Sequence, residues 1–348
     1  MDYPLLVSIV VPCRNERNHI KQCVTSILEQ QRSASGDYEI LIVDGMSTDG
    51  TRDILRGLAT VNSSIRIVDN PSGITASAMN IGIGEARGRY IAILGAHTEY
   101  AADYIRTCVE LLDEHPEAAC VGGPIVTMGR SLFGQAVAAA MSHPVGIGNA
   151  KHRHPSYQGY AEGACYPVFR KAIFEKIGLY DEQLIRNQDD ELNYRLTKSG
   201  GKVFISPRAR SVYFARETVW GLSRQYFQYG YWRVAVLRKH RVPASIRQIV
   251  APISLFVMLV ITLISTSLPG WWRLAPGIPI SIYAATLLIV GMRLIGKADW
   301  RLACLFPIAA GCMHAAYAIG FACGVVKGPH GTRTDVFGNK GEYHASRT

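Results

Sequence analysis

The chain has 348 residues, of which 48% are hydrophobic and 18% are charged, and its formal net charge is +10. This composition excludes a disordered chain, a collagen-like chain and a small disulfide scaffold, and the length predicts about two domains. The positive charge is unevenly distributed, because residues 1 to 215 carry 22 basic and 23 acidic side chains, a net charge of −1. A nearly neutral N-terminal part gives no support for nucleic-acid binding, so we expect no nucleic-acid partner.

In the first third of the chain, short runs of branched apolar residues alternate with helical patterns. The predicted strands are Val7 to Val11, Glu39 to Val43, Ile65 to Val68 and Tyr90 to Leu94, and the predicted helices are His19 to Glu29, Thr51 to Leu58, Ala76 to Ala86 and Asp103 to Glu114. The alternation predicts an α/β fold, with a mostly parallel sheet and helices on both faces. Ligands bind at the carboxyl ends of strands in such sheets, so the polar residues after each strand are the first candidates for a functional site.

Two polar loops follow the first two predicted strands. Pro12 to Glu16 follows the first strand and Asp44 to Thr51 follows the second, and both offer carboxylates that could bind a ribose or a base. Taken singly, these residues could equally begin or cap the helices that follow. The first strand is followed neither by a phosphate-loop motif nor by a dinucleotide-binding glycine motif, which disfavours kinase-like and dehydrogenase functions.

Three segments follow one another in the order V-S-I-V-V-P-C-R-N-E, I-L-I-V-D-G-M-S-T-D-G-T and D-N-P-S-G-I-T-A-S-A-M-N-I-G. Together they resemble glycosyltransferase family 2, the inverting enzymes of the GT-A fold that use nucleotide-sugar donors. The resemblance implies a Rossmann-like GT-A sheet and a uridine pocket. The residues that it places in or beside this pocket are Pro12, Arg14, Glu16, Asp44, Ser47, Gly73 and Asn80.

The resemblance continues towards residue 200. Tyr160 to Tyr180, which includes Glu162 and Gly163, resembles the acceptor-side segment of the family, and N-Q-D-D-E-L-N-Y-R-L at Asn187 to Leu196 resembles its catalytic motif, E-D-x-D/E. Inverting transfer needs a base for the acceptor hydroxyl, and the motif implies Asp189 in this role with Glu191 as a supporting acid. The first acidic residue of the motif is Gln188 here, which lowers the negative charge near Asp189. The alternative for Asp189 is a helix N-terminus, where carboxylates favour the macrodipole.

The segment after the fourth predicted strand departs from the family. The family has an Asp-x-Asp motif that holds the nucleotide and a divalent metal, whereas this chain reads Gly95-Ala96-His97-Thr98-Glu99. By alignment Ala96 and His97 belong to the nucleotide-sugar site, and His97 is the candidate metal ligand. Mg²⁺ prefers oxygen ligands and imidazole suits Mn²⁺ better, so the sequence predicts a weakened or unusual metal site that favours Mn²⁺.

Residues 216 to 247 combine aromatic and basic side chains, with seven basic residues against Glu217 alone. This pattern predicts a basic interfacial helix at a membrane surface. It also resembles the Q-x-x-R-W region of membrane-bound family members, and the candidate acceptor or membrane-interface residues are Arg224, Gln225, Gln228 and Trp232. Two interpretations remain open, since the segment either closes the acceptor site or only anchors the chain.

Three uncharged stretches follow, at Ile249 to Trp272, Leu274 to Met292 and Leu302 to Val326. Each exceeds or approaches the roughly 20 residues that a helix needs to cross a bilayer, so we predict about three transmembrane helices in residues 248 to 326 and a tail at 327 to 348. The basic residues before the first stretch predict that the domain at 1 to 215 lies in the cytoplasm and the tail outside. No signal-peptide pattern begins the chain, which agrees with a cytoplasmic domain on the plasma membrane.

Within the family, the run A-V-A-A-A-M-S-H-P-V-G-I-G, the run R-Q-Y-F-Q-Y-G and the apolar stretches most resemble the membrane-bound succinoglycan-type glucosyltransferases. We therefore expect an enzyme that moves a sugar from a UDP-sugar, with UDP-glucose the first candidate, to a polyprenyl-diphosphate-linked saccharide. The alternatives are a processive polysaccharide synthase and a non-catalytic nucleotide-binding scaffold.

Overall fold

The structure is a computed structural model that describes residues 5–31, 37–96, 98–241, 245–295 and 299–328. The contacts between these residues divide the chain into two compact units. The first contains the described parts of Met1–Val126 and Lys151–Tyr213, and the second those of Thr127–Ala150 and Phe214–Pro329.

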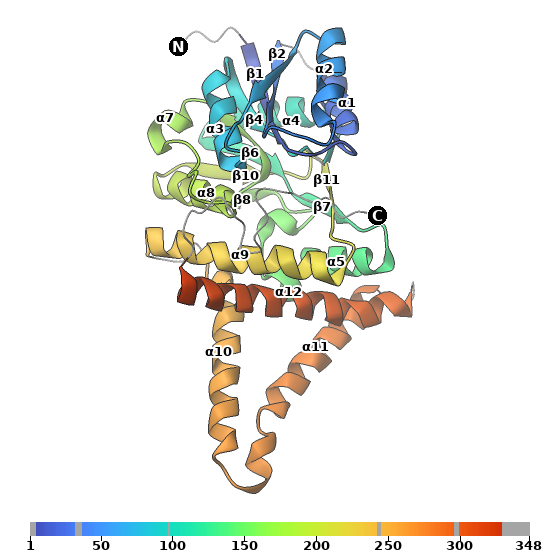
Figure 1. Ribbon diagram of the computed structural model, residues 1–348, viewed down its shortest axis with the longest axis vertical. Helices are drawn as coiled ribbons and strands as arrows, with labels where there is room; N and C mark the ends of the chain where they lie inside the picture. The colour runs from blue at the N-terminus through green and yellow to red at the C-terminus, as the bar shows by residue number, and fades with distance from the viewer. Residues whose placement is uncertain (1–4, 32–36, 97, 242–244, 296–298, 329–348) are drawn as a thin grey trace. The chain divides into compact units, whose positions relative to one another are not determined.

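The first unit is built on an eight-stranded sheet with the order β3-β2-β1-β4-β9-β6-β10-β8 (Figure 1). The strands are β1 (Leu5–Cys13), β2 (Tyr38–Asp44), β3 (Ile65–Asp69), β4 (Gly88–Ile93), β6 (Ala118–Gly123), β8 (Gly159–Ala161), β9 (Cys165–Arg170) and β10 (Lys202–Ile205). The pairs β1–β2, β1–β4, β2–β3 and β6–β10 are parallel, whereas β9 is antiparallel to β4 and β6 and β8 is antiparallel to β10. A smaller sheet has the order β5-β11-β7, with β5 (Glu99–Tyr100), β11 (Ser211–Phe214) and β7 (Ile125–Met128). The predicted mostly parallel α/β sheet is confirmed.

Helices cover both faces of the large sheet, as the alternation predicted. The helices α1 (Ile20–Gln31), α2 (Thr51–Val61) and α4 (Tyr104–Glu114) pack on one face, and α3 (Thr75–Glu85), α7 (Ile173–Ile177) and α8 (Gln188–Lys198) pack on the other. The period of two along a strand creates these two cores, because Ile9 points into the first and its neighbour Val10 into the second. The sheet therefore carries loops at its carboxyl edge that are held from both sides.

Strand β1 is longer than predicted, since it passes through Pro12 and ends at Cys13. Proline lacks an amide hydrogen and is normally confined to strand edges. Here the pairing of β1 with β4 ends at Val10 and Ile93, so Pro12 has a neighbouring strand only on the side of β2. The missing donor therefore breaks no ladder bond, and the strand can continue to the first polar loop.

A buried carboxylate ties the amino ends of the central strands together. Glu39 on β2 is 2% exposed and accepts hydrogen bonds from Ser8 Oγ (2.7 Å), the amide of Arg87 (2.8 Å) and NH1 of Arg66 (3.0 Å). Burial alone raises the pKa of Glu39, but the hydrogen bonds from Arg87, Ser8 and Arg66 outweigh it and hold the pKa below its ordinary value of 4.5.

Replacing this carboxylate should weaken the fold in a pH-dependent way. We expect Glu39→Gln to lower the free energy of unfolding by about 2 to 3 kcal/mol near neutral pH, less than for a fully buried pair because both arginines reach water. Folding lowers the pKa of Glu39, so its contribution is present above about pH 4.5 and is lost as the pH falls further. Urea unfolding in detergent measures the free energy of unfolding of the unmodified chain and of the Glu39→Gln chain. The difference between the two should become smaller as the pH is lowered, and a difference that does not change with pH would contradict the stabilising role of the Glu39 carboxylate.

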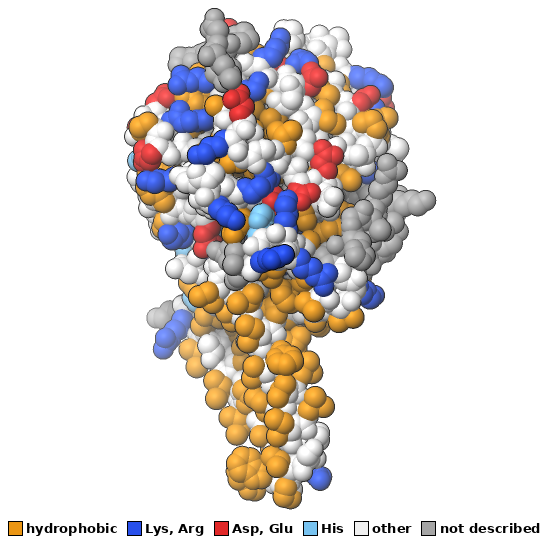
Figure 2. Space-filling view, turned by 90° about the vertical axis from the view of Figure 1, so that its left-hand side faces the viewer, with side chains coloured by type: hydrophobic (Ala, Val, Ile, Leu, Met, Phe, Trp, Pro, Cys, Tyr) orange, Lys and Arg blue, Asp and Glu red, His pale blue; other side chains and the backbone are white. Residues whose placement is uncertain are grey.

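The second unit consists of helices, which are α5 (Leu132–Ser142), α6 (Pro144–Ile147), α9 (Val219–His240), α10 (Arg247–Thr266), α11 (Gly277–Ile295) and α12 (Trp300–Lys327). Three of them, α10, α11 and α12, are long and apolar enough to cross a membrane. The short helix η2 (Gly270–Leu274) connects α10 to α11, so Trp271 and Trp272 belong to a turn rather than to the first apolar helix. Hydrophobic side chains cover this hairpin, as Figure 2 shows.

Candidate functional site

The loops after β1 and β2 are fastened to one another by hydrogen bonds between side chains and backbone. The amide of Asn15 donates to Ser47 Oγ (2.8 Å), and Asn15 Oδ1 accepts from the amide of Thr48 (2.9 Å). One residue further, the amide of Glu16 donates to Thr51 Oγ1 (2.9 Å). These bonds hold Asn15 in a left-handed conformation (φ 54°), which asparagine tolerates better than most residues. The two polar loops predicted from the sequence therefore form one rigid rim.

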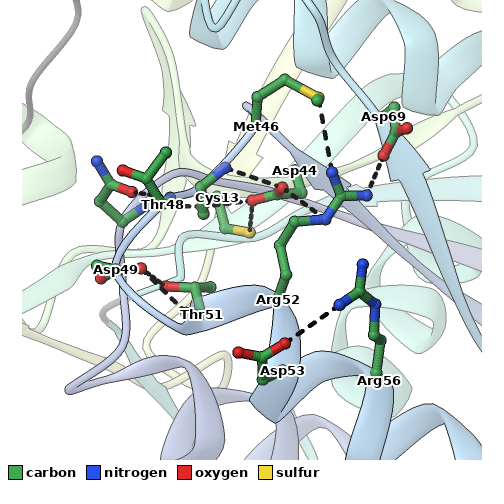
Figure 3. A network of polar contacts seen from close by, with 12 residues as sticks. Cys13, Asp44, Met46, Thr48, Asp49, Thr51, Arg52, Asp53, Arg56 and Asp69 are labelled. Carbon is green, nitrogen blue, oxygen red and sulfur yellow. Dashed lines mark hydrogen bonds and ion pairs between the residues drawn. The ribbon is translucent and has the colours of Figure 1, made fainter.

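Asp44 is fully buried at the end of β2 and is the centre of a polar network (Figure 3). Its carboxylate accepts from the amide of Ser47 (3.1 Å) and from Ser47 Oγ (2.5 Å). The Arg52 guanidinium on α2 lies beside it, with Nε 3.4 Å from Oδ2, and also pairs with Asp69 at the end of β3. The network thus joins the carboxyl ends of the neighbouring strands β2 and β3.

The thiol of Cys13 completes the network from β1. Cys13 Sγ lies 3.6 Å from Asp44 Oδ1, in the geometry of a hydrogen bond donated by the thiol. Burial raises the pKa of Cys13, and the Asp44 carboxylate raises it further. The thiol therefore stays protonated at neutral pH, so it supports Asp44 and is no nucleophile.

Arg14 crosses from the loop after β1 to the segment before α3. Its NH1 donates to the carbonyl of Gly73 (3.3 Å), which has a left-handed φ of 65°. A Cβ at position 73 would lie 2.1 Å from NH1 of Arg14, so glycine is required for this close approach. Among the described residues, the buried Nε of Arg14 has no hydrogen-bond partner. Arg14 therefore keeps a donor that an anionic ligand could use.

Asn80 on α3 holds the segment that leads to α8. Its Oδ1 accepts from the amide of Tyr180 (2.9 Å), and its Nδ2 donates to the carbonyl of Tyr180 (2.9 Å) and to Glu182 (2.8 Å). The side chain thus clamps the backbone between α7 and α8. It connects the donor-side helix α3 to the segment that carries the candidate base.

The two candidate catalytic carboxylates of α8 have opposite environments. Asp189, in the first turn, is exposed, and its Oδ1 accepts from the amide of Asp190 (2.9 Å). Glu191 is fully buried and forms a bidentate pair with Arg195, whose Nε lies 2.9 Å from Oε1 and whose NH2 lies 2.7 Å from Oε2. Arg195 also donates to the carbonyls of Ile177 and Leu179. Only Asp189 is placed to meet a substrate from solvent.

Residues of the acceptor-side segment lie against α8. Gly163 lies close to α8, because a Cβ there would lie 2.7 Å from Nδ2 of Asn193, and the neighbouring Glu162 is exposed. Burial raises the pKa of Cys165 to about 12, with the charges of Asp189 and Asp190 adding to the effect. Cys165 is therefore a protonated neighbour of the first turn of α8 and not a reactive thiol.

An aromatic cluster lies beside Gly95, the position at which the resemblance implies a metal-binding aspartate. A Cβ at Gly95 would lie 3.0 Å from Cε1 of Tyr166, whose ring is perpendicular to that of Tyr100 at a centroid distance of 5.3 Å. Tyr166 also accepts a hydrogen bond from Thr98 Oγ1 (2.7 Å). A side chain at position 95 would thus require the ring of Tyr166 to shift. Ala96, next to it, is buried.

The described residues do not supply a metal site by themselves. They contain no group of three or more His, Cys, Asp and Glu side chains that could hold an ion. Glu99 accepts a hydrogen bond from Gln22 Nε2 (2.8 Å), and His97, the predicted ligand, lies outside the described residues. The described residues alone therefore supply no three-ligand site.

Besides Glu162 and Gly163, the residues predicted at the acceptor or membrane interface lie on α9, in the second unit; they are Arg224, Gln225, Gln228 and Trp232. Gln228 and Trp232 are buried, at 6% and 2% exposure, and Gln225 Nε2 donates to the hydroxyl of Tyr229 (3.1 Å). Arg224 is half-buried. Their assignment to an acceptor remains a prediction.

Sequence reasoning missed Arg52, Arg195 and Tyr166. Arg52 is a single arginine within a helix, and no local pattern distinguishes it from a solvent-exposed charge. Tyr166 has a left-handed φ of 49°, which sequence cannot reveal for a tyrosine. Only the i, i+4 spacing of Glu191 and Arg195 was a usable signal, because such pairs interact on a helix.

Comparison with protein families matches residues 8–178 to the family described as Glycosyl transferase family 2. The succinoglycan biosynthesis protein ExoA of Rhizobium meliloti (strain 1021) is 32% identical over 324 residues, which cover 90% of this chain and 93% of that protein. A dolichyl N-acetyl-alpha-D-glucosaminyl phosphate 3-beta-D-2,3-diacetamido-2,3-dideoxy-beta-D-glucuronosyltransferase of Methanococcus voltae is 29% identical over 329 residues, which cover 92% of this chain and 98% of that protein.

Among solved structures, the chain is similar to a mannosyltransferase from Pyrobaculum calidifontis in complex with GDP-Man and Mn²⁺. The TM-score is 0.59 at 18% identity, and the match covers 91% of this chain and 88% of the other. At this identity the likeness shows a shared fold.

Proposed function

Because this chain belongs to glycosyl transferase family 2 and is therefore a glycosyltransferase, we propose that it transfers a sugar with inversion from a UDP-sugar to a polyprenyl-diphosphate-linked saccharide. The predicted GT-A fold is confirmed. The observation that best supports the proposal is the contrast between the buried network around Asp44 and the exposed carboxylate of Asp189. The first is suited to binding a nucleotide, and the second to accepting a proton.

On the donor side, we propose that the rim formed by the loops after β1 and β2 holds the uridine, with Pro12, Glu16 and Ser47 lining it. The carboxylate of Asp44 is held in place by Ser47 and Arg52. Asp44 therefore contributes a fixed negative charge and a rigid base to the uridine pocket. Arg14 retains a buried N–H that suits the diphosphate, since guanidinium groups bind such oxygens strongly.

On the acceptor side, we propose Asp189 as the general base. The acceptor hydroxyl oxygen attacks the anomeric carbon on the face opposite the diphosphate, the bond to the diphosphate oxygen breaks, and the hydroxyl proton moves to Asp189. This displacement inverts the anomeric configuration. Glu191 does not touch the reactants in this proposal, because its carboxylate is occupied by Arg195, and it acts as a positioning residue.

The lipid acceptor is supported by the apolar helices and by the relative from Methanococcus voltae, whose name contains a dolichyl phosphate. The relative from Rhizobium meliloti supports a role in exopolysaccharide assembly, with UDP-glucose as the first donor to test. We further propose that residues 1 to 215 lie on the cytoplasmic side, because the chain is most basic just before α10.

The direct test is transfer of radiolabelled sugar into a lipid extract by membranes that contain the full chain. We expect label from a UDP-sugar to enter the lipid phase, and none with the Asp189→Asn chain. Label from GDP-mannose alone would refute the UDP donor. Long polymer in place of a single added sugar would favour a processive synthase.

The finer metal assignment is also a proposal, which rests on residue types and not on a described site. We expect Mn²⁺ to support more activity than Mg²⁺ at the same concentration, and His97→Ala to weaken Mn²⁺ binding measured directly by electron paramagnetic resonance in the presence of UDP. The matched control is Glu99→Gln, which should leave Mn²⁺ binding unchanged. Full activity in excess chelator would show that the reaction does not need a metal ion.

A further inference from the structure

Helix α12 differs from the other two apolar helices in how much of it the protein covers. Of its most apolar 18-residue window, 39% is buried, compared with 6% for α10 and 11% for the segment that contains α11. The covered face contacts α5, α9 and α11, so α12 is the helix on which the second unit is assembled. A helix with this much protein contact is not exposed to lipid on all sides.

The main partner of α12 is α9, and the two helices run side by side (Figure 1). Cys312 Sγ lies near the carbonyl of Val219 (3.7 Å), and Arg238 NH2 donates to the carbonyl of Val325 (2.8 Å), so the helices are parallel over most of α9. Glycines at the contact let the backbones touch, since a Cβ at Gly230 would lie 2.0 Å from the carbonyl oxygen of Tyr317. On α12, a Cβ at Gly320 or Gly324 would lie 2.1 or 2.6 Å from a carbonyl oxygen of α9.

Helix α9 is a poor membrane span. It carries four basic residues and no acidic ones, and Arg233 lies near its middle. Charged side chains in the hydrocarbon core are costly, whereas basic and aromatic side chains suit the headgroup zone. If α9 lies along the membrane surface, α12 lies along it as well, because the two are parallel neighbours.

Apart from Trp300, Arg301, Val325 and Lys327 near the two helix ends, the exposed side chains of α12 form one apolar stripe, which we call the lipid stripe. Its members are Cys304, Ile308, Ala315, Ile319, Ala322 and Val326. At about 100° per residue they fall within about 60° of one another around the helix. The opposite face is buried and includes Phe306, Met313 and Gly320. One apolar stripe opposite a protein-covered face is the pattern of a helix that lies flat on a bilayer.

The hairpin of α10 and α11 has the dimensions of a complete crossing. The 20 residues of α10 extend for about 30 Å, the thickness of a bilayer's hydrocarbon core. Trp271 and Trp272 stack at its turn, with ring centroids 3.9 Å apart, and Arg273 follows. This turn suits the far interface, where tryptophan is enriched and arginine can reach the headgroups.

We propose that only α10 and α11 cross the membrane, and that the lipid stripe of α12 rests on the same bilayer surface from which α10 enters. The tail after Lys327 then lies on the side of α9, opposite to the position that three crossings would give. The charges agree, because residues 327 to 348 carry four basic and two acidic side chains, whereas the turn at 267 to 276 carries Arg273 alone. Two crossings therefore place every basic cluster on one side, as the positive-inside rule favours.

Tags that report their side of the membrane test this topology in the full chain. In right-side-out vesicles and in inside-out vesicles alike, we expect the protease to cleave either both the N-terminal and the C-terminal tag or neither of them. A tag inserted after Leu274 should behave in the opposite way. A C-terminal tag on the side of the Leu274 tag would overturn the proposal.

Depth measurements test the lipid stripe itself. Spin labels at Cys304, Ala315→Cys and Val326→Cys, each in a chain whose other α12 cysteines are serine, should report equal depths near the headgroups. A spanning helix would separate residues 304 and 326 by about 33 Å. A label at Phe256→Cys on α10 is the control and should lie near the bilayer centre. Labels on the stripe that are shielded from lipid would instead indicate a second protein copy and refute the bilayer contact.

A charge placed on each helix gives a matched pair of variants. Ile319→Lys lies mid-stripe on α12, where a lysine can reach the headgroups, so its abundance in membranes should match that of the unmodified chain. Phe256→Lys lies mid-helix on α10 and should lower abundance severalfold. Equal loss in both variants would contradict a surface position of α12.

Discussion

Replacing Asp189 by Asn should lower the rate of sugar transfer by about 10²- to 10⁴-fold, the range that a general base contributes. The amide keeps the size and the hydrogen-bond acceptor of the side chain but cannot take the acceptor proton. Asp189 is exposed in the first turn of α8, so we expect the substitution to leave the fold intact. Initial rates of lipid labelling, compared with UDP binding by calorimetry, measure the two effects separately.

Two control variants make this result specific. Asp190→Asn changes the neighbouring carboxylate on the same helical turn and should leave turnover close to that of the unmodified chain. Asp44→Asn disturbs the buried network with Ser47 and Arg52 and should weaken UDP binding instead. If sugar transfer survives Asp189→Asn but is lost in Asp190→Asn, the general base is Asp190 and not Asp189.

The first half of the fold was predictable because its elements follow one another locally. Branched residues in runs of four or five, separated by helical patterns, predict parallel strands, and β1 to β4 appear where the pattern places them. The second half contains short strands without this regularity. Strand β9 lies antiparallel between β4 and β6, a pairing set by tertiary contacts that no local pattern encodes.

The candidate site was predictable in its residue types but not in its connections. The sequence places Asn80 near a nucleotide, whereas the structure shows it clamping Tyr180, a hundred residues away. The sequence likewise shows that Gly95 removes a carboxylate, but not that Tyr166 fills the space. Contacts of this kind depend on the packing of distant segments, so a motif can name a residue without stating what it touches.

The buried pair of Glu191 and Arg195 gives the second large effect. Glu191→Gln should lower the free energy of unfolding by about 3 to 5 kcal/mol, since it leaves Arg195 without its buried carboxylate. It should also lower kcat, because Arg195 holds the carbonyls of Ile177 and Leu179 at the start of the segment that leads to Asp189. Arg195→Gln removes the same link and should give a similar loss.

The two roles of Glu191 are separable by pH dependence and by additivity. A positioning residue leaves the shape of the kcat profile against pH unchanged, because Asp189 still takes the proton, and only the height of the profile falls. If Glu191 exchanged protons with the reactants, Glu191→Gln would instead remove one limb of the kcat profile. The double variant Glu191→Gln with Arg195→Gln should be little worse than either single variant, because both remove one shared interaction. Additive losses in the double variant, or a missing limb of the kcat profile, would contradict the positioning role and indicate that Glu191 takes part in proton transfer.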